Sequence, residues 1–362
     1  MKDEGNSSKM KPGKESRQKA ERPITLKAVA QHVKLSPGTV SAVVNDSPAA
    51  KHIPAHTKDR VLAAVRELNY QPNFFARTLR KKRTYTIGII AHEIGDAYSS
   101  PVIAGVENFL RAQNYFFLTG IHRHDPQLLE SYTSILLQRG VEGFITIDLN
   151  LPHRLALPTV ALAGHRHHPG VTNIVLDHRK AAWIALRHLS DLGHRRIAFM
   201  RGHPSSSDSV HRWESIREVA QEFSIVIDPQ LTVQIESQES SPELGYPYIK
   251  KLLARKQPFT ALFAYNDISA IGAIRALREA GLQVPRDVSV VGFDDIEGAA
   301  FHNPSLTTVR QPLRQMGEVA ARTLLARIED TEEYPDEIAI QPELVVRESS
   351  AQAPTSSSSE RQ

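Results

Sequence analysis

Residues 25–45 read T-L-K-A-V-A-Q-H-V-K-L-S-P-G-T-V-S-A-V-V-N and predict two short helices joined by a tight turn. Ser36 is a good N-cap for the second helix, and Pro37 stands where a first-turn proline is tolerated. A wedge of two helices cannot bury its apolar side alone, so we expect a third helix over residues 57–70. The apolar residues at helical spacing are Leu26, Val29, Ala30, Val33, Val40, Val43, Val44, Val61, Leu62, Val65 and Leu68. A three-helix unit with a polar second helix has the size of a major-groove reader, although an ordinary small bundle is the alternative.

The charge of the chain is divided unevenly along its length. Residues 1–83 hold 18 Lys and Arg against 7 Asp and Glu, a net charge of +11. The rest of the chain carries a net charge of −7, so the total of +4 conceals a basic head on an acidic body. This asymmetry predicts a polyanionic partner at one end. Residues 1–22 lack apolar periodicity, and we expect them to form a disordered basic tail.

The overall composition excludes several classes of protein. At 362 residues, 41% of them hydrophobic, the chain suits one small domain and one or two larger ones. The absence of cysteine rules out disulfides, thiolate metal sites and a cysteine nucleophile. No apolar run approaches a membrane span, and the N-terminus has no apolar signal region. We therefore expect a cytoplasmic protein without a membrane partner, ending in a disordered polar tail over residues 349–362.

From residue 85 onward, short β-branched runs alternate with helical patterns. The expected strands cover residues 86–91, 116–120, 143–147, 159–163, 173–176, 196–200, 261–264 and 288–293. The expected helices cover residues 102–113, 128–139, 181–192, 210–223, 250–254 and 268–280. This alternation predicts an α/β fold of doubly wound parallel sheets, in two lobes with a cleft between them. Ligands of such folds bind beyond the carboxyl ends of the strands.

Six motifs, taken together, carry a resemblance to a known family. They are T-V-S-A-V-V-N at 39–45, L-N-Y-Q-P-N at 68–73, L-G-H-R-R-I-A at 192–198, Y-N-D at 265–267, V-S-V-V-G-F-D-D at 288–295 and L-T-T-V-R-Q-P at 306–312. In this order and spacing they resemble the lactose/galactose-repressor family of transcription regulators. The resemblance implies a helix-turn-helix domain over 23–71, a hinge helix and linker over 72–84, and a periplasmic-binding-protein-like body of two lobes over 85–348, which binds an effector and dimerises.

The resemblance also implies how the head reads DNA. Pro37, Gly38 and Ala42 stand where relatives often carry base-reading side chains, yet none of the three can make a bidentate hydrogen bond to a base. Leu79 aligns with the apolar lever that wedges into the minor groove, the alternative being a packed leucine in a helical linker. The predicted DNA-binding residues are Thr25, Ser36, Pro37, Gly38, Thr39, Ser41, Ala42, Asn45, Tyr70, Asn73, Ala76 and Leu79.

Polar residues just after the expected strands predict the effector site. Carboxylates, an amide and an arginine around a cleft suit a hydroxyl-rich small molecule, and an aromatic ring can stack on a sugar or a nucleobase. The predicted effector-binding residues are Asp96, Tyr98, Ser100, Asp148, His165, Asp177, Arg212, Asn266 and Asp294. Aspartates after strands are also common helix caps, the role we expect for Asp267. Sugar, sugar phosphate and nucleoside stay open, and the resemblance favours a carbohydrate.

The expected function follows from these parts. The run of His165, Arg166, His167 and His168 does not predict a metal site, because consecutive loop residues rarely converge on one ion. With no nucleophile elbow, phosphate-binding glycine loop or H-E-x-x-H, we expect no cofactor and no enzyme activity. We predict a homodimeric repressor that binds a pseudo-palindromic double-stranded operator under effector control. A sugar-binding transport receptor and a hydrolase are the alternatives; the missing signal region and the basic head argue against the first.

Overall fold

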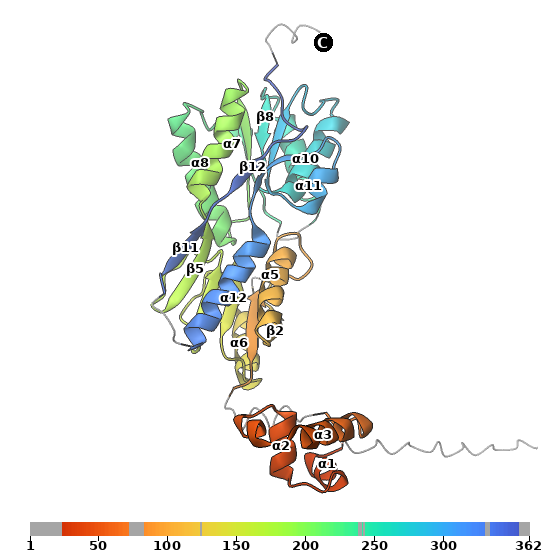
Figure 1. Cartoon of the computed structure of the whole chain (residues 1–362). Coiled ribbons are helices and arrows are strands. Elements are labelled where there is room, and N and C mark those ends of the chain that lie inside the picture. Colours follow the sequence, from red (N-terminus) through yellow and green to blue (C-terminus); the bar gives the residue numbers. More distant parts are fainter. Residues whose placement is uncertain are drawn as a thin grey trace, which may run out of the picture. The chain divides into compact units, whose positions relative to one another are not determined.

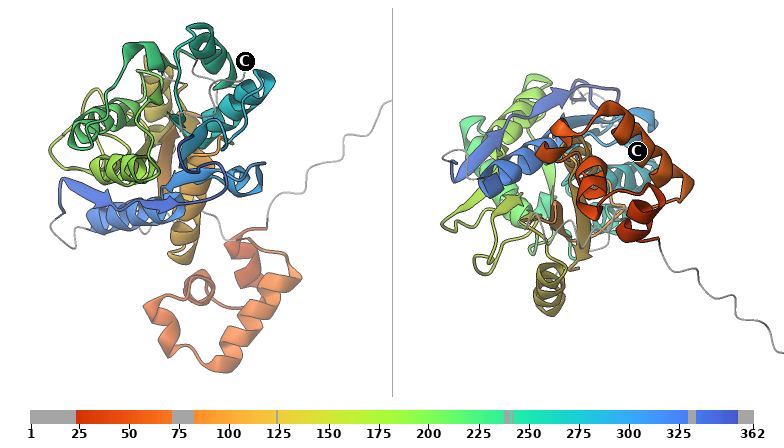
Figure 2. Two further views of the ribbon diagram at one scale, coloured as in Figure 1. Left: turned by 90° about the horizontal axis from the view of Figure 1, so that it is seen from above. Right: turned by 60° about the horizontal axis from the view of Figure 1, so that its bottom comes forward.

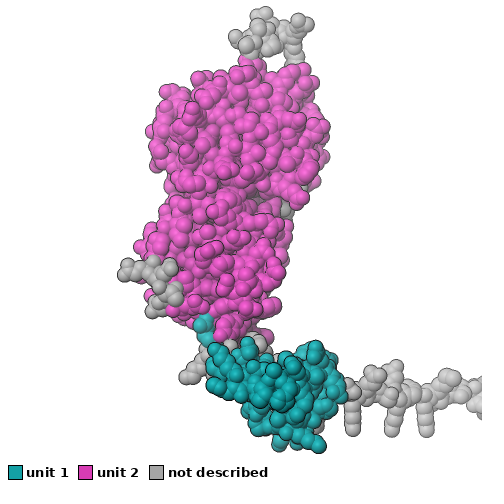
Figure 3. All heavy atoms as spheres, viewed as in Figure 1, with its two compact units in different colours: residues 1–83 teal, residues 84–362 magenta. Residues whose placement is uncertain are grey.

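The computed structural model describes residues 24–71, 83–123, 125–237, 241, 243–329 and 334–354. The chain divides into two compact units, residues 1–83 and residues 84–362 (Figure 3). The predicted basic tail and the hinge residues Asn73, Ala76 and Leu79 lie outside the described residues. In the part of the chain that is described, no helix is long and apolar enough to cross a membrane.

The first unit is a small helical bundle around an apolar core (Figure 1). Thr25 and Ser36 cap the first two helices: their hydroxyl oxygens accept hydrogen bonds from the backbone N–H of Ala28 at 3.2 Å and of Thr39 at 3.0 Å. Leu62, which the pattern placed on the inner face, is instead 43% exposed. The elements of the unit are α1 (Leu26–His32), α2 (Pro37–Val44), a 3-10 turn η1 (Pro48–His52) and α3 (Ala55–Glu67).

The second unit consists of two lobes, each built on a six-stranded sheet. The first sheet has the order β11-β5-β4-β3-β1-β2, with β1 (Thr86–Ala91), β2 (Phe116–Ile121), β3 (Phe144–Ile147), β4 (Thr159–Leu162), β5 (Val171–Leu176) and β11 (Glu337–Ile340). The second has the order β12-β10-β9-β8-β6-β7, with β6 (Ile197–Arg201), β7 (Thr232–Gln234), β8 (Ala261–Phe263), β9 (Ser289–Asp294), β10 (Thr307–Arg310) and β12 (Glu343–Val345). Of these pairs, β12 with β10 is antiparallel, and the others are parallel.

Helices cover both sheets, as Figures 1 and 2 show. The first lobe carries α5 (Ser99–Ala112), α6 (Pro126–Gln138) and α12 (Leu313–Glu329); the second carries α7 (His178–Asp191), α8 (Ser207–Glu222), a 3-10 turn η2 (Pro229–Leu231), α9 (Tyr246–Ala254), α10 (Asp267–Glu279) and α11 (Glu297–Phe301). Strands such as β1 and β9 are buried along their whole length, which explains their unbroken apolar runs. Within the described residues the chain passes between the lobes after β5, after β10 and after β11. The predicted α/β class with two parallel-sheet lobes is confirmed.

The polar segment after residue 348 is partly built into the second lobe, contrary to the prediction of a disordered tail. Ser349 is fully buried; its N–H donates to the Ser305 carbonyl at 2.9 Å, and its hydroxyl donates to the Val290 carbonyl at 2.6 Å. Further along, the Ala353 N–H donates to the Leu192 carbonyl at 2.8 Å. Hydrogen bonds to backbone anchor this segment, so it needs no apolar side chains to be ordered. Residues 355–362 lie outside the described part.

Candidate effector site

A cavity of about 120 Å³ lies between the two lobes of the second unit. Strand ends of both sheets meet there, since Asp148 follows β3 and Asp294 ends β9. Six of the nine predicted effector residues line the cavity: Asp96, Tyr98, Asp148, Arg212, Asn266 and Asp294. The rule that ligands bind beyond the carboxyl ends of parallel strands therefore located the cleft correctly.

Arg212, on α8, is the buried cation of this cavity. Its side chain is held by a hydrogen-bonded ion pair with Asp208, with Nη2 to Oδ2 at 2.8 Å, and by a hydrogen bond from Nη1 to the Tyr265 carbonyl at 2.7 Å. The guanidinium also lies over the ring of Phe293, 3.6 Å from the centroid. Its Nε has no hydrogen-bond partner in the described structure, so one buried donor remains available to a ligand.

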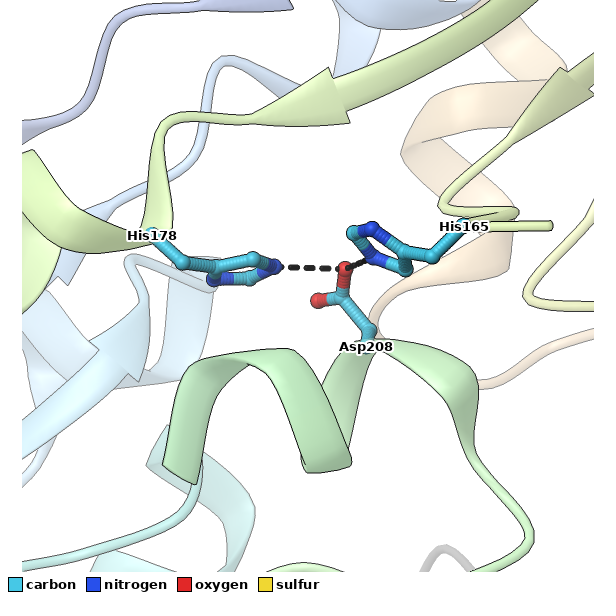
Figure 4. A group of neighbouring side chains, drawn as sticks. All are labelled: His165, His178 and Asp208. Atoms are coloured by element: carbon cyan, nitrogen blue, oxygen red, sulfur yellow. Dashed lines mark hydrogen bonds and ion pairs between the residues drawn. The ribbon is translucent and has the colours of Figure 1, made fainter. Parts of the chain in front are cut away.

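Asp208 is held from its other side by two histidines, shown in Figure 4. His178 Nε2 lies 2.8 Å and His165 Nε2 lies 3.1 Å from the same oxygen, Oδ1. Burial favours protonation of Asp208, but His178, His165 and Arg212 outweigh it and hold the pKa of this carboxyl well below its usual range. The carboxylate thus stays ionised and fixes the position of Arg212.

The His165–His178–Asp208 group also has the spacing of a metal site, because its ligand atoms lie within 4.8 Å of one another. Two observations favour a hydrogen-bonded ion cluster instead. Arg212 already neutralises Asp208 through the second carboxylate oxygen. Among the described residues, the Nδ1 atom of His178 has no hydrogen-bond acceptor of the kind that normally supports a metal-bound imidazole.

The beginning of α8 joins the two lobes through short polar contacts. The Ser206 hydroxyl donates to Asp148 Oδ1 at 3.1 Å, and the Ser207 hydroxyl donates to the Ala163 carbonyl at 2.5 Å. Together with the His165–Asp208 contact, these bonds connect the ends of β3 and β4 to the second lobe. A change in the lobe positions must therefore break or rearrange them.

Two carboxyl groups of the cavity have unusual backbone and electrostatic settings. Asp148 and Asp294 both adopt positive φ angles, +48° and +110°, which non-glycine residues rarely do. Burial and the nearby Asp208 raise the pKa of Asp148 to about 7. Burial likewise raises the pKa of Asp294 to about 7, although Arg212 and a hydrogen bond from Gln311 oppose the shift. Both carboxyls can therefore change protonation near neutral pH.

The remaining residues of the cavity wall hold the local backbone in place or offer groups to a ligand. The hydroxyl oxygen of Tyr98 is buried without a hydrogen-bond partner in the described structure, and burial raises the pKa of this phenol well above its usual value. The Asn266 side-chain oxygen accepts from the Ser269 N–H at 2.9 Å and so caps α10. Asp96 Oδ1 accepts from the N–H groups of Tyr98 and Ser99 at the start of α5. Asn266 thus caps α10, Asp96 fixes the backbone that leads into α5, and both residues line the cavity.

Three predicted effector residues are not at the cavity wall. Ser100 is exposed and lines a wider hollow of about 740 Å³ that shares Asp96 and Asp294 with the cavity. His165 lies behind Asp208, and Asp177 caps α7, its Oδ1 accepting from the Lys180 N–H at 2.8 Å. The prediction that Asp177 lines the cleft is therefore wrong.

The expected cap role of Asp267 is also wrong, because Asn266 caps α10. Asp267 is fully buried and accepts hydrogen bonds from the Thr308 hydroxyl and the Ile296 N–H. It ties α10 to β10 and to the loop after β9.

The sequence prediction missed several wall residues, above all Asp208, as well as His203, Ser206 and Tyr265. Asp208 precedes Arg212 by four positions at the start of a helix, a spacing that places two opposite charges side by side. That signal was present in the sequence. Tyr265 contributes through its backbone carbonyl and through its ring, 4.9 Å from the Arg212 guanidinium carbon, and no sequence pattern marks such a contact.

In the first unit, the predicted DNA-binding residues separate into exposed and buried ones. Thr25, Ser36, Pro37 and Gly38 are exposed, whereas Thr39, Ser41 and Asn45 are half-buried. The Asn45 amide donates to the Ser41 carbonyl at 2.8 Å, which fixes the end of α2.

Ala42 and Tyr70 are only 7% and 8% exposed. Tyr70 belongs to the apolar core of the unit. Both side chains are thus almost fully buried in this structure, and their assignment to DNA binding stays a prediction.

Comparisons with known proteins agree with both units. Residues 25–73 match the family of bacterial regulatory proteins called the lacI family, and residues 186–350 match a periplasmic binding protein-like domain. The HTH-type transcriptional repressor PurR of Erwinia tasmaniensis is 33% identical over 339 residues, covering 91% of this chain and 98% of that protein. PurR of Yersinia enterocolitica is 32% identical over the same coverage.

Comparison with solved structures also finds transcription regulators. The Lac repressor dimer bound to operator and the anti-inducer ONPF superimposes with a TM-score of 0.82 at 26% identity, covering 91% of this chain and all of that one. The regulator CelR in complex with cellobiose follows with a TM-score of 0.68 at 28% identity and the same coverage. A LacI-family regulator of Enterococcus faecium with bound ribose has a TM-score of 0.65 at 27% identity, covering 74% of this chain and all of that one. The chain belongs to the lacI family of bacterial regulatory proteins.

Proposed function

We propose that this DNA-binding transcriptional repressor takes a small carbohydrate effector in the cleft between its lobes. The observation that carries the proposal is the Arg212–Asp208 pair, assembled at the cavity with one free guanidinium donor. As a lacI-family protein the chain is a small-molecule-controlled regulator and not an enzyme. The proposal concerns the carbohydrate class of the effector and the residues that hold it.

The chemistry of the wall supports a hydroxyl-rich ligand. The Asp148 and Asp294 carboxylates accept hydrogen bonds from sugar hydroxyls, while Arg212 Nε donates to a ring or hydroxyl oxygen. Tyr98 adds an aromatic ring to the same wall, and aromatic rings commonly pack against the C–H faces of sugars. Cellobiose and ribose, carried by two of the structural relatives, belong to this ligand class.

The first unit supports operator binding. In the family the two capped helices form a helix-turn-helix, and here Ser36, Pro37 and Gly38 at the start of α2 are exposed. The Lac repressor relative is a dimer bound to its operator, and we extend this arrangement to two copies of the present chain on a pseudo-palindromic site. The net charge of +11 over residues 1–83 supplies the attraction to phosphate.

Effector control follows from the contacts that α8 makes across the cleft. A ligand that hydrogen-bonds to Asp148 and Arg212 competes with the Ser206–Asp148 contact and changes how strongly the lobes are held together. A ligand with different affinity for two lobe arrangements shifts their populations, and a coupling of about 1–3 kcal/mol changes operator affinity about 5- to 150-fold.

Two measurements test the proposal. Calorimetry of the full chain against a panel of monosaccharides, disaccharides and nucleosides should give saturable heat with at least one sugar. Gel-shift titration with genomic fragments should then give a retained fragment whose affinity changes when that sugar is added. Binding of a nucleoside but no sugar would reject the carbohydrate claim, and indifference to every DNA fragment in each ligand state would reject the operator claim.

A further inference from the structure

A second hollow of about 350 Å³ lies on the second lobe, lined by residues distinct from those of the effector cavity. It is formed by the end of β6, one face of α8 and the short strand β7. Its lining includes Arg201, Gly202, Trp213, Arg217 and Gln234. No proposed step of effector or operator binding uses it.

Two arginines of this hollow make no ion pair with any carboxylate in the described part of the chain. Arg201 is half-buried at the end of β6, and its Nε is buried without a hydrogen-bond partner in the described structure. Arg217 is exposed on α8 and makes no ion pair with any described residue. Burial and the charge of Arg217 lower the pKa of Arg201, so the two cations stand close enough to repel each other. Folding tolerates such a pair most easily when an anion neutralises it.

A second arginine–tryptophan pair, on α7, provides a comparison, because its arginine also stacks on an indole but faces a carboxylate. Arg187 lies 4.9 Å from the ring of Trp183, as Arg201 does from the ring of Trp213. Arg187, however, faces the carboxylate of Asp191 at 3.5 Å. The stacking is the same in both pairs, but within the described residues the arginine at the hollow makes no ion pair with a carboxylate.

We infer that this hollow binds a small phosphate-bearing anion between Arg201 and Arg217. Two guanidinium groups supply two positive charges and several N–H donors, which match the charge and oxygen geometry of a phosphate dianion. The indole of Trp213 gives an apolar wall for an organic part of the ligand. The hollow, of about 350 Å³, has room for a small ligand, and Glu214 in its lining limits the net positive charge of the site.

The hollow adjoins the effector site through shared elements. Trp213 follows Arg212 directly on α8, and Gly202 leaves no room for a side chain because the Tyr265 ring packs against it. Tyr265 in turn accepts a hydrogen bond from Arg212. An anion bound at the hollow therefore contacts the same helix that positions the effector-binding cation.

The test is calorimetry of the full chain with inorganic phosphate, with sodium chloride at equal ionic strength as the reference. We expect one saturable site per chain in the wild type and in the control Arg187→Gln. Arg217→Gln should weaken binding at least tenfold, Arg217→Lys should retain part of it, and Arg201→Gln should abolish it. Because Arg217 is exposed and forms no ion pair with the residues that the structure describes, its variants are expected to fold normally, which circular dichroism checks.

Glucose 6-phosphate, with glucose as its unphosphorylated control, distinguishes a phosphorylated metabolite from the free phosphate ion as the ligand. Tighter, Arg217-dependent binding of glucose 6-phosphate than of phosphate identifies a phosphorylated metabolite, and equal binding identifies the free ion. Absence of saturable phosphate binding would overturn the inference. So would phosphate binding that is unchanged in Arg217→Gln, since the ion would then sit elsewhere, for example at Arg212.

Discussion

The two walls of the effector cavity differ in how completely their polar groups are used. On the second lobe, Asp208 is engaged by Arg212, His178 and His165 at once. On the first lobe, Asp148 receives a side-chain hydrogen bond from Ser206, and the Tyr98 hydroxyl has no partner in the described structure. The second-lobe wall is thus preorganised around Asp208, with Arg212 Nε left for a ligand, whereas on the first lobe the Tyr98 hydroxyl and the Asp148 carboxyl can take up a ligand contact or a proton.

The largest difference between the two walls should appear in the free energy of unfolding when a carboxylate is removed from each. Asp208→Ala leaves a buried arginine without its counter-charge, and we expect the free energy of unfolding to fall by about 3–5 kcal/mol. Asp148→Ala, the matched first-lobe change, should cost about 1 kcal/mol or less because one hydrogen bond is lost. Urea denaturation measures both, and equal losses would show that the walls do not differ as described.

A second effect concerns the pH dependence of stability. The pKa values of Asp148 and Asp294 are about 7 in the folded chain, above those of an unfolded aspartate, so the folded state binds more protons between about pH 4 and pH 7. The free energy of unfolding should therefore decrease as pH rises through this window, by about 4 kcal/mol for each of the two carboxyls, and level off above it. The depressed pKa of Asp208 acts in the opposite direction and only at lower pH.

Asp148→Asn together with Asp294→Asn should flatten this dependence, whereas Asp191→Asn on the exposed face of α7 should not. Denaturation at several pH values between 4 and 8 gives the comparison. A double variant whose profile follows that of the wild type would mean that the two carboxyls do not titrate there.

Effector affinity should also depend on the protonation of Asp148 and Asp294, but it should increase rather than decrease as pH rises. Sugar hydroxyls donate to an ionised carboxylate better than to a protonated one, so affinity should fall about tenfold per pH unit below about pH 7 for each linked proton. Asp148→Asn should bind more weakly at pH 8 and lose part of this pH dependence. Calorimetry with the sugar found in the screen measures both, and an affinity that rises on acidification would contradict hydroxyl-to-carboxylate bonding.

The smallest expected effect distinguishes Tyr98 from Tyr248. Tyr98→Phe removes a hydroxyl that has no partner in the described structure, so the free energy of unfolding should change by less than about 0.5 kcal/mol. Tyr248→Phe removes a hydroxyl that accepts from the N–H groups of Glu236 and Ser237, and should cost about 1 kcal/mol. Thermal or urea unfolding of the pair tests this; a Tyr98 variant as destabilised as the Tyr248 variant would assign that hydroxyl a structural partner.

The sequence predicted most of the buried strands, including the short β8, but it missed β7 and β12 and also the 17-residue helix α12. Runs such as β1 and β9, each six residues long, were located within a residue or two. Strands β7 and β12, of three residues each, have too few positions to show a period. The ordered segment after residue 348 was missed because its anchors are hydrogen bonds from a buried serine to backbone groups, which leave no apolar signature.

For the site, the strand-end rule found the groups that face the cavity but could not separate them from caps. Asp177 and His178 are neighbours after β5, yet Asp177 caps α7 while His178 reaches Asp208. The choice depends on the backbone angles at the start of the helix, which residue identity does not determine. Asp208 itself needed a helical spacing argument from Arg212 rather than the strand-end rule.

The central claim is that ligand at the preorganised wall controls operator binding. Fluorescence anisotropy of a labelled operator fragment, titrated with wild-type and Arg212→Ala protein in the presence and absence of the sugar effector, tests it directly. We predict that the sugar changes the operator affinity of the wild type at least fivefold, while the variant binds the fragment as the ligand-free wild type does and no longer responds. An Arg212→Ala protein that remains folded and responds to the sugar as the wild type does would contradict the account.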